Sequence, residues 1–296
     1  YGTDDDSNSR FLAAASLFRA TGKAKYNDYF LANYTKSQES FENPSGDCVG
    51  SRNFAFFSYL KADNHSIAAE NWFKDEFTIW IDNKIDRYQS SAWGNIIANG
   101  NYYWGSNSQV LGVCMEAVIG SRLLETYNST IERMAFASLN WILGTNPMRK
   151  SFVSGYGKDC IKTIFSTFNN DGKTGIPSGF MPGGPNRYQG VGLSIFPAKC
   201  YLDSADEWTT NEHTTGWNSI LVFMAAFASK NNDTNIITPG DVNGDGIVNS
   251  LDYVYVRRYI LGILSGFPVE TGFEAADINN DSYVNSLDYM KLKDLI

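Results

Sequence analysis

Apolar residues recur at every third or fourth position along the first part of the chain, which is the spacing of amphipathic helices. In residues 9–22, Phe11, Ala15 and Phe18 fall on one face, and Gly22 follows as a common helix terminator. The pattern therefore predicts a helix that ends near Gly22 and packs its apolar face inward.

Two later segments predict helices of different character. Residues 129–144 end at another glycine, Gly144, and carry an apolar face made of Ile131, Met134, Ala135, Leu139 and Ile142. Residues 216–229 are apolar nearly all round, which predicts a helix buried among other helices. No segment alternates apolar and polar residues for more than a few positions, so we expect an all-α protein.

The segments between the predicted helices indicate where the chain divides into domains. From Gly144 to Glu212 the sequence is dense in Gly, Pro, Asn and Ser, and loops of that length in a compact domain are usually functional. Residues 229–239 are polar and lead into a Pro-Gly pair, which predicts a linker. We therefore expect a large domain over residues 1–228 and a small one over residues 240–296.

Composition narrows the possible functions. The chain has 296 residues, of which 43% are hydrophobic, enough for one large core and a smaller one. A net charge of −8 argues against nucleic acid, whose phosphates bind clustered Lys and Arg. The sequence contains no run of 18 apolar residues, so it predicts no membrane-spanning helix. The sequence opens with Tyr1 and an acidic stretch, without a signal peptide, as expected of a mature or truncated product.

The four cysteines, Cys48, Cys114, Cys160 and Cys200, lie far apart and lack the close pairs of a zinc site. Two alternatives stay open for them. They form up to two disulfides in a secreted protein, or they are buried as free thiols.

A 36-residue repeat begins at Asp241 and again at Asp277, and VNSLDY recurs unchanged in both copies. Each copy offers side-chain oxygens at loop positions 1, 3, 5, 9 and 12 and a backbone carbonyl at position 7, the spacing with which a 12-residue loop wraps calcium. The predicted ligands of two Ca²⁺ ions are Asp241, Asn243, Asp245, Ile247, Asn249, Asp252, Asp277, Asn279, Asp281, Tyr283, Asn285 and Asp288. Ser282 replaces the usual glycine at position 6, which predicts a strained or weaker second loop.

Because Pro-Gly precedes the first loop, the entering helix of a calcium sensor is missing there. A duplicated loop followed by a helix, with Asp at position 12, resembles a type I dockerin, a module that binds a cohesin domain on a scaffold protein. The resemblance assigns cohesin binding to Ser250, Leu251, Arg257, Arg258, Ser286, Leu287 and Lys293. Leu at position 11 departs from the common Thr, which leaves the cohesin class open. A solvated helix face is the alternative interpretation of the Arg257–Arg258 pair.

Five stretches of the large domain, taken in order, resemble the C-terminal half of a family-9 glycoside hydrolase. They are residues 1–22, 102–107, 139–157, 179–186 and 201–223. That family consists of inverting cellulases built as an (α/α)6 toroid of six helical hairpins. The resemblance implies that this chain holds the C-terminal part of such a toroid.

In this family the Glu of an Asn-Glu pair before the last buried helix is the general acid, and here that residue is Glu212. A general acid protonates the leaving oxygen as the glycosidic bond breaks. From the sequence alone, a Glu in such a loop is more often a helix-capping or surface residue, and it is the ordered motifs of the resemblance that favour the catalytic acid.

Two family features are absent from the sequence. The Asp-Ala-Gly-Asp motif that supplies the catalytic base is missing, and the His-His-Arg cluster after residues 151–157 is replaced by a stretch without histidine. Asn169, Asn170 and Arg187 are candidates to replace that cluster. The candidate sugar contacts are Trp93, Tyr103, Trp104, Arg187 and Trp208, and packing is the alternative role of each aromatic residue.

Two functions remain. The first is an extracellular endo-β-1,4-glucanase of the cellulosome, completed by an N-terminal part of its own catalytic domain. The second is an inactive module, derived from a hydrolase, that binds glucan or protein and docks on the scaffold.

Overall fold

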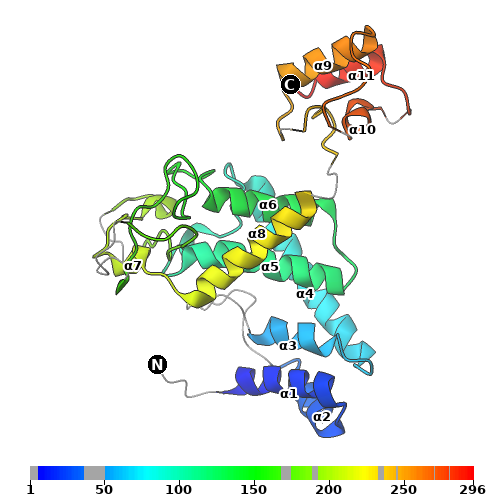
Figure 1. Cartoon of the computed structure of the whole chain (residues 1–296). Coiled ribbons are helices and arrows are strands. Elements are labelled where there is room, and N and C mark those ends of the chain that lie inside the picture. Colours follow the sequence, from blue (N-terminus) through cyan, green and yellow to red (C-terminus); the bar gives the residue numbers. More distant parts are fainter. Residues whose placement is uncertain are drawn as a thin grey trace. The chain divides into compact units, whose positions relative to one another are not determined.

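The computed structural model describes residues 6–36, 51–167, 175–188, 193–232, 237–244, 246–269, 271–279 and 281–296. The chain separates into two compact units, Tyr1–Ala226 and Phe227–Ile296. The described part contains helices and no named strand (Figure 1). The expected boundaries at residues 228 and 240 stay predictions.

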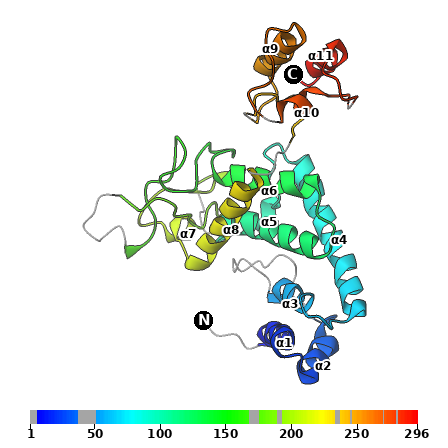
Figure 2. The same cartoon turned by 45° about the vertical axis from the view of Figure 1, so that its right-hand side comes forward.

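Within the described residues of the first unit, six longer helices and two short 3₁₀ helices come before α7 and α8. They are α1 (Ser7–Thr21), α2 (Ala24–Asn33), α3 (Ser51–Tyr59), α4 (Ile67–Ser90), η1 (Asn99–Asn101), α5 (Ser106–Leu123), α6 (Ser129–Ile142) and η3 (Pro197–Lys199). The short α7 (Trp208–Asn211) and the long α8 (Thr215–Asn232) follow. Figures 1 and 2 show α4, α5 and α6 as a layer of long helices that α8 crosses, with the long loops and α7 gathered at one end.

Stacked aromatic rings connect α1, α2 and α3. The Phe30 ring lies 4.5 Å from that of Phe11 and 3.7 Å from that of Tyr59, both nearly parallel. The Phe56 ring stacks on Phe73 of α4 at 4.2 Å and extends this packing into the helix layer. All five side chains are buried, so the aromatic residues of this region serve packing.

The predicted helix stops are mostly confirmed. Helix α1 buries Phe11, Ala15 and Phe18 and ends at Gly22, whose φ of 63° is left-handed. Helix α6 buries its predicted apolar face and ends at Ile142, two residues before Gly144. Asn128 begins α6, because its side-chain oxygen accepts the N–H groups of the first turn.

The prediction that residues 216–229 form a helix buried on all sides was wrong for one face of the helix. Helix α8 buries Trp217, Ile220 and Met224 against the layer, but Val222 is 68% exposed. An apolar helix with an uncovered apolar face is unusual in a compact domain. The described residues therefore supply packing partners for only part of its circumference.

Two opposite charges are buried where α4 faces α5. Lys84 is 2% exposed and Glu116 is 3% exposed, and the Asn53 amide donates a 2.5 Å hydrogen bond to Glu116 Oε2. Burial, with the nearby Arg87 charge, lowers the pKa of Lys84 to about 7, although Glu116 opposes the shift. The layer thus holds a lysine that titrates near neutral pH.

This lysine predicts a pH-dependent stability. Since the pKa of Lys84 is about 7 when folded and about 10.4 in an unfolded chain, the unfolded state binds more protons between these values. The free energy of unfolding should therefore rise with pH from 7 to 9, by up to about 1.4 kcal/mol per unit. Urea unfolding at several pH values measures this slope, and Lys84→Met should flatten it. Equal slopes in the two proteins would contradict the prediction.

In the described residues of the second unit, three helices follow α8: α9 (Ser250–Ile260), α10 (Gly272–Ala276) and α11 (Ser286–Lys293). Its buried core consists of Val242, Val256, Ala275, Ala276 and Leu292. The rings of Tyr253 and Tyr289, which occupy the same position in the two repeats, stack at 3.9 Å. The repeats therefore pack against each other through equivalent residues.

Two further expectations concern cysteines and membranes. Cys114, Cys160 and Cys200 are buried free thiols, which favours the second of the two alternatives, and Cys48 lies outside the described residues. Burial raises the pKa of the Cys114 thiol to about 12.

Within the described part of the chain, no helix has the length and apolar character needed to cross a membrane.

Candidate active site and calcium loops

Glu212 lies between α7 and α8, where three loops meet. Its backbone carbonyl accepts a 2.7 Å hydrogen bond from the Gly183 N–H. Next to it, the Asn211 carbonyl accepts a 2.8 Å bond from the Phe165 N–H. These backbone contacts fix the Glu212 position against the loops of residues 163–167 and 179–186.

The Glu212 side chain is half-buried and has a specific donor. The indole Nε1 of Trp104 lies 3.0 Å from Glu212 Oε2, although the two residues are 108 positions apart. The Trp104 ring packs edge-to-face on Trp217 of α8, with centroids 4.9 Å apart. The indole is therefore held from behind while its N–H orients the carboxyl group.

Asn211 secures the turn that carries Glu212. Its buried amide donates to the carbonyls of Thr163 and Ser204 at 3.0 and 2.8 Å and accepts from the Tyr201 hydroxyl. A buried amide with this many partners has one allowed orientation. The sequence singled out the Glu of the Asn-Glu pair, but the Asn does the positioning.

A glycine in the GFMPGGPN stretch permits the close approach of two loops. Gly184 donates its N–H to the Thr210 carbonyl at 2.9 Å with φ of +89°. A Cβ atom there would lie 2.3 Å from the Asn107 side chain. The Asn107 amide in turn donates to the Pro182 carbonyl at 3.1 Å, so the WGSN and PGGPN stretches lock together.

A second carboxylate among these loops, Asp203, serves to hold the loop backbone in place. It accepts the backbone N–H groups of Lys162 and Thr163 at 2.9 and 3.0 Å and the Thr163 hydroxyl at 2.8 Å. Next to Glu212, His213 packs edge-to-face on Phe180 at 4.8 Å. Burial lowers the pKa of His213, against the opposing charge of Glu212, so the imidazole is neutral at pH 7.

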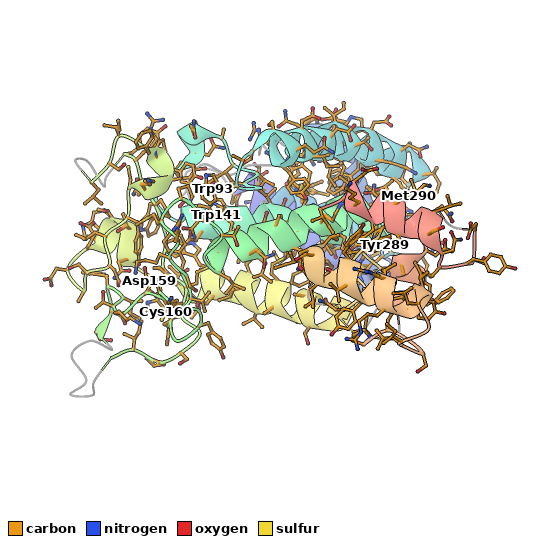
Figure 3. The ribbon with its side chains drawn as sticks, turned by 90° about the horizontal axis from the view of Figure 1, so that it is seen from above. Trp93, Trp141, Asp159, Cys160, Tyr289 and Met290 are labelled. Atoms are coloured by element: carbon orange, nitrogen blue, oxygen red, sulfur yellow. The ribbon has the colours of Figure 1, made fainter. Side chains whose placement is uncertain are left out.

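The other predicted sugar contacts lie around the same loops. The Tyr103 hydroxyl accepts from the Gln109 amide, and Arg187 donates to the Asn99 carbonyl at 3.2 Å. Trp208 is 45% exposed on α7 and Trp93 is 42% exposed after α4. Trp93 and Trp141 line the same cavity, and both residues are labelled in Figure 3. Asn169 and Asn170 lie outside the described residues.

In the second unit, the two loops bring their carboxylates inward. Carboxylate oxygens of Asp277, Asp281 and Asp288 lie within 4.8 Å of one another, close enough to share one cation. In the first loop, Asp252 is fully buried and accepts the N–H groups of Val242 and Asn249, both at 3.0 Å. Asp245 lies outside the described residues.

The residues at position 9 of the two loops, which are predicted calcium ligands, also cap the helices that follow. The side chains of Asn249 and Asn285 each begin a helix by accepting the N–H of Leu251 and Leu287, at 2.7 and 2.8 Å. Position 12 completes the capping box from the other side. Among the remaining predicted ligands, Asn279 donates to Asp281 at 2.8 Å, and the Ile247 and Tyr283 side chains are exposed.

The predicted strain in the second loop is confirmed. Ser282 has φ of 69°, a left-handed conformation that Gly246 adopts in the first loop with φ of 82°. A residue with a Cβ pays about 1–2 kcal/mol there. The seven predicted cohesin contacts are all exposed on the described surface of this unit: Ser250, Leu251, Arg257, Arg258, Ser286, Leu287 and Lys293.

Relieving the strain should stabilise the unit. We expect Ser282→Gly to raise the free energy of unfolding of the calcium-loaded unit by about 1 kcal/mol. Gly246→Ser is the matched control, because no atom lies within 4 Å of a Cβ placed there, and it should lower stability by a similar amount. Thermal unfolding in excess calcium measures both. An unchanged or lower melting temperature for Ser282→Gly would contradict the strain argument.

A helical layer with a carboxyl group held among long loops, joined to a unit of two acidic loops, defines a modular all-α protein. The family model of glycosyl hydrolase family 9 matches residues 1–225, and that of the type I dockerin domain matches residues 239–296. The chain belongs to glycosyl hydrolase family 9 and carries a type I dockerin domain. Its large unit is accordingly part of an (α/α)6 barrel.

Similar proteins agree with this family. Cellulose 1,4-beta-cellobiosidase of Acetivibrio thermocellus is 34% identical over 58% of this chain and 21% of the relative. Endoglucanase D of the same organism is 28% identical over 90% of this chain and 41% of the relative. The solved structure of AaCel9A in complex with cellobiose-like isofagomine superimposes with a TM-score of 0.70 at 22% identity, over 78% of this chain and 44% of the other. The chain thus spans less than half the length of these proteins.

Proposed function

We propose that this chain is the acid-bearing part of a cellulosomal β-1,4-glucanase that acts with inversion. The observation that carries the proposal is the Glu212 carboxyl group, held by the Trp104 indole where three loops meet. The family and the named relatives, which include a cellobiosidase and an endoglucanase, support a glucan substrate. Internal cleavage is the mode we propose.

Glu212 is the general acid in this proposal. Because Trp104 holds Oε2, the other oxygen, Oε1, carries the proton to the leaving glycosidic oxygen. Inversion also requires a second carboxylate, about 6.5–9.5 Å away, that activates water on the opposite face of the sugar. Asp203 does not suit that role, since three donors already occupy it.

We infer that the base comes from an N-terminal part of the same catalytic domain. The chain spans 41% of endoglucanase D and 44% of the AaCel9A chain, which leaves room in those proteins for the other helical hairpins. The exposed Val222 face of α8 is an apolar surface that such hairpins would cover. Trp93, Tyr103, Trp104, Arg187 and Trp208 are the proposed sugar contacts.

The dockerin unit supplies the anchor. Type I dockerin domains bind calcium, and we propose two ions, one in each loop. The twelve oxygen donors predicted from the repeat would hold them, and the exposed residues that follow each loop would contact a cohesin domain. The whole protein would then act outside the cell as part of a cellulosome.

An inactive, glucan-binding module is the alternative function. The missing base motif and the missing histidine cluster favour it. Release of reducing sugar from soluble β-1,4-glucan separates the two, using this chain alone and mixed with the N-terminal part of a family-9 catalytic domain. Activity that appears only in the mixture supports the glucanase. Inertness in the mixture, together with binding to glucan, supports the module.

A further inference from the structure

The sequence contains two Asn-Gly pairs, and the structure gives them opposite surroundings. One pair is Asn99 and Gly100, in the short helix η1, and the other is Asn243 and Gly244, in the first calcium loop. In an Asn-Gly pair the backbone nitrogen of the glycine can attack the asparagine side chain, because no Cβ atom hinders the approach. Each pair is therefore a candidate site of spontaneous deamidation.

The surroundings of Asn99 leave the attacking atom unhindered. Asn99 and Gly100 are both exposed. In the described part of the chain the Gly100 N–H makes no hydrogen bond, and no atom lies within 4 Å of a Cβ placed on Gly100. The backbone around Gly100 therefore has room to bring its nitrogen to the side-chain carbonyl carbon of Asn99.

The surroundings of Asn243 oppose the same attack. The Gly244 N–H donates to Asp241 Oδ1 at 2.8 Å, so the attacking nitrogen is already occupied. A Cβ placed on Gly244 would lie 2.7 Å from the Val269 side chain, which crowds the backbone there. An intramolecular attack needs its two reacting atoms aligned at about 3–3.5 Å. Asn243 is therefore the internal control for Asn99.

A cation lies at the backbone carbonyl of Asn99. Arg187 Nη1 donates a 3.2 Å hydrogen bond to this carbonyl oxygen. The next carbonyl, that of Gly100, accepts the Tyr188 hydroxyl at 2.8 Å, which holds the two loops together. The cyclic imide formed by the attack has two carbonyls that water can open, and the backbone carbonyl of Asn99 is one of them. A guanidinium on its oxygen favours addition of water there and stabilises the carboxylate that results.

We propose that Asn99 deamidates spontaneously and that Arg187 directs the product to isoaspartate. The Gly100 nitrogen loses its proton to water and bonds to the side-chain carbonyl carbon of Asn99, and ammonia leaves. Water then adds to the backbone carbonyl carbon of Asn99, and the bond from this carbon to the Gly100 nitrogen breaks. Overall, one water is consumed, ammonium is released, and the chain continues through the former side chain. The free carboxylate remains beside the Arg187 guanidinium.

This modification has a consequence for the loops around Glu212. Arg187 is a proposed sugar contact, so a carboxylate paired with its guanidinium would compete with a bound glucan. That consequence rests on the proposed function, whereas the modification itself needs neither substrate nor activity.

Incubation of the complete chain in H₂¹⁸O with calcium, followed by mass spectrometry of its peptides, tests the proposal. We expect ¹⁸O to enter at position 99 at least about tenfold faster than at position 243. Gly100→Ala should slow entry at position 99 about tenfold, because the methyl group hinders the attack. The open space around Gly100 lets this variant keep the fold.

The role of Arg187 is tested by the ratio of isoaspartate to aspartate at position 99. A synthetic peptide of residues 96–103 gives the ratio that arises without the guanidinium. We expect a higher ratio in the folded chain, and Arg187→Met should lower it to the value of the peptide. Circular dichroism of each variant shows whether the fold is intact.

The outcomes separate this inference from the proposed function. Faster labelling at position 99 than at position 243, with a ratio above that of the peptide, supports the proposal whether or not the completed enzyme hydrolyses glucan. Equal labelling at the two positions overturns it, as does an unlabelled position 99 once the peptide has reacted completely. A ratio that Arg187→Met leaves unchanged overturns the directing role of Arg187.

Discussion

Replacing Glu212 with Gln should reduce glucan hydrolysis by about 10²- to 10⁴-fold in the form of the protein that is active, which is the contribution of a positioned general acid. The amide keeps the size of the side chain and can still accept from the Trp104 indole, but it has no proton of suitable acidity for the glycosidic oxygen. The rate constant for reducing-sugar release at saturating substrate is the quantity to measure, because binding should change little.

Two further variants show whether the effect belongs to the acid. Trp104→Phe retains an aromatic ring against Trp217 but removes the N–H that orients the carboxyl group. It should give a smaller loss, about tenfold, of the size expected for one misplaced catalytic contact. Glu125→Gln, on an exposed residue after α5, should leave the rate unchanged. A Glu212→Gln protein that keeps more than a tenth of the activity would remove Glu212 from the mechanism.

Removing calcium should unfold the dockerin unit and abolish cohesin binding. Its described core contains five fully buried hydrophobic residues, too few to offset the ordering of a unit of this size. Asp252 and Asp288 are both fully buried, and in an ion-free loop their charges lack a cation. At a free calcium concentration 100 times the Kd, each site contributes about 2.7 kcal/mol, or a factor of 100 in the folded population.

Titration with a chelator, followed by circular dichroism and by calorimetry with a cohesin domain, measures this loss. Asp252→Ala should mimic it at saturating calcium, while Asp294→Ala, on an exposed residue outside both loops, should bind normally. The large unit should keep its helical signal in chelator. Full cohesin affinity without calcium would show that the core suffices and that the loops serve another purpose.

The parts of this structure that could be predicted from sequence depend on local spacing. The face of α6 and the end of α1 at Gly22 follow from periodicity over a few turns, and the calcium loops follow from ligand spacing within 12 residues. The strain at Ser282 was equally visible, because one position of a repeated loop demands a left-handed backbone.

The parts that could not be predicted depend on contacts between distant residues. Nothing in the sequence shows that Trp104 reaches Glu212 across 108 positions, or that Asn211 anchors the turn through Thr163 and Ser204. The prediction that α8 is buried on all sides was wrong for a related reason. An apolar pattern indicates that a face should be covered, but it does not say whether the covering residues belong to the described chain.

The shared use of Asn249 and Asn285 has a mechanical consequence. Each amide joins a loop to the first turn of the following helix, so the loop cannot extend unless that turn also unwinds. A pulling force transmitted through the dockerin unit therefore meets one cooperative element and not a loop that yields before its helix. The anchor should resist tension and then fail in a single step.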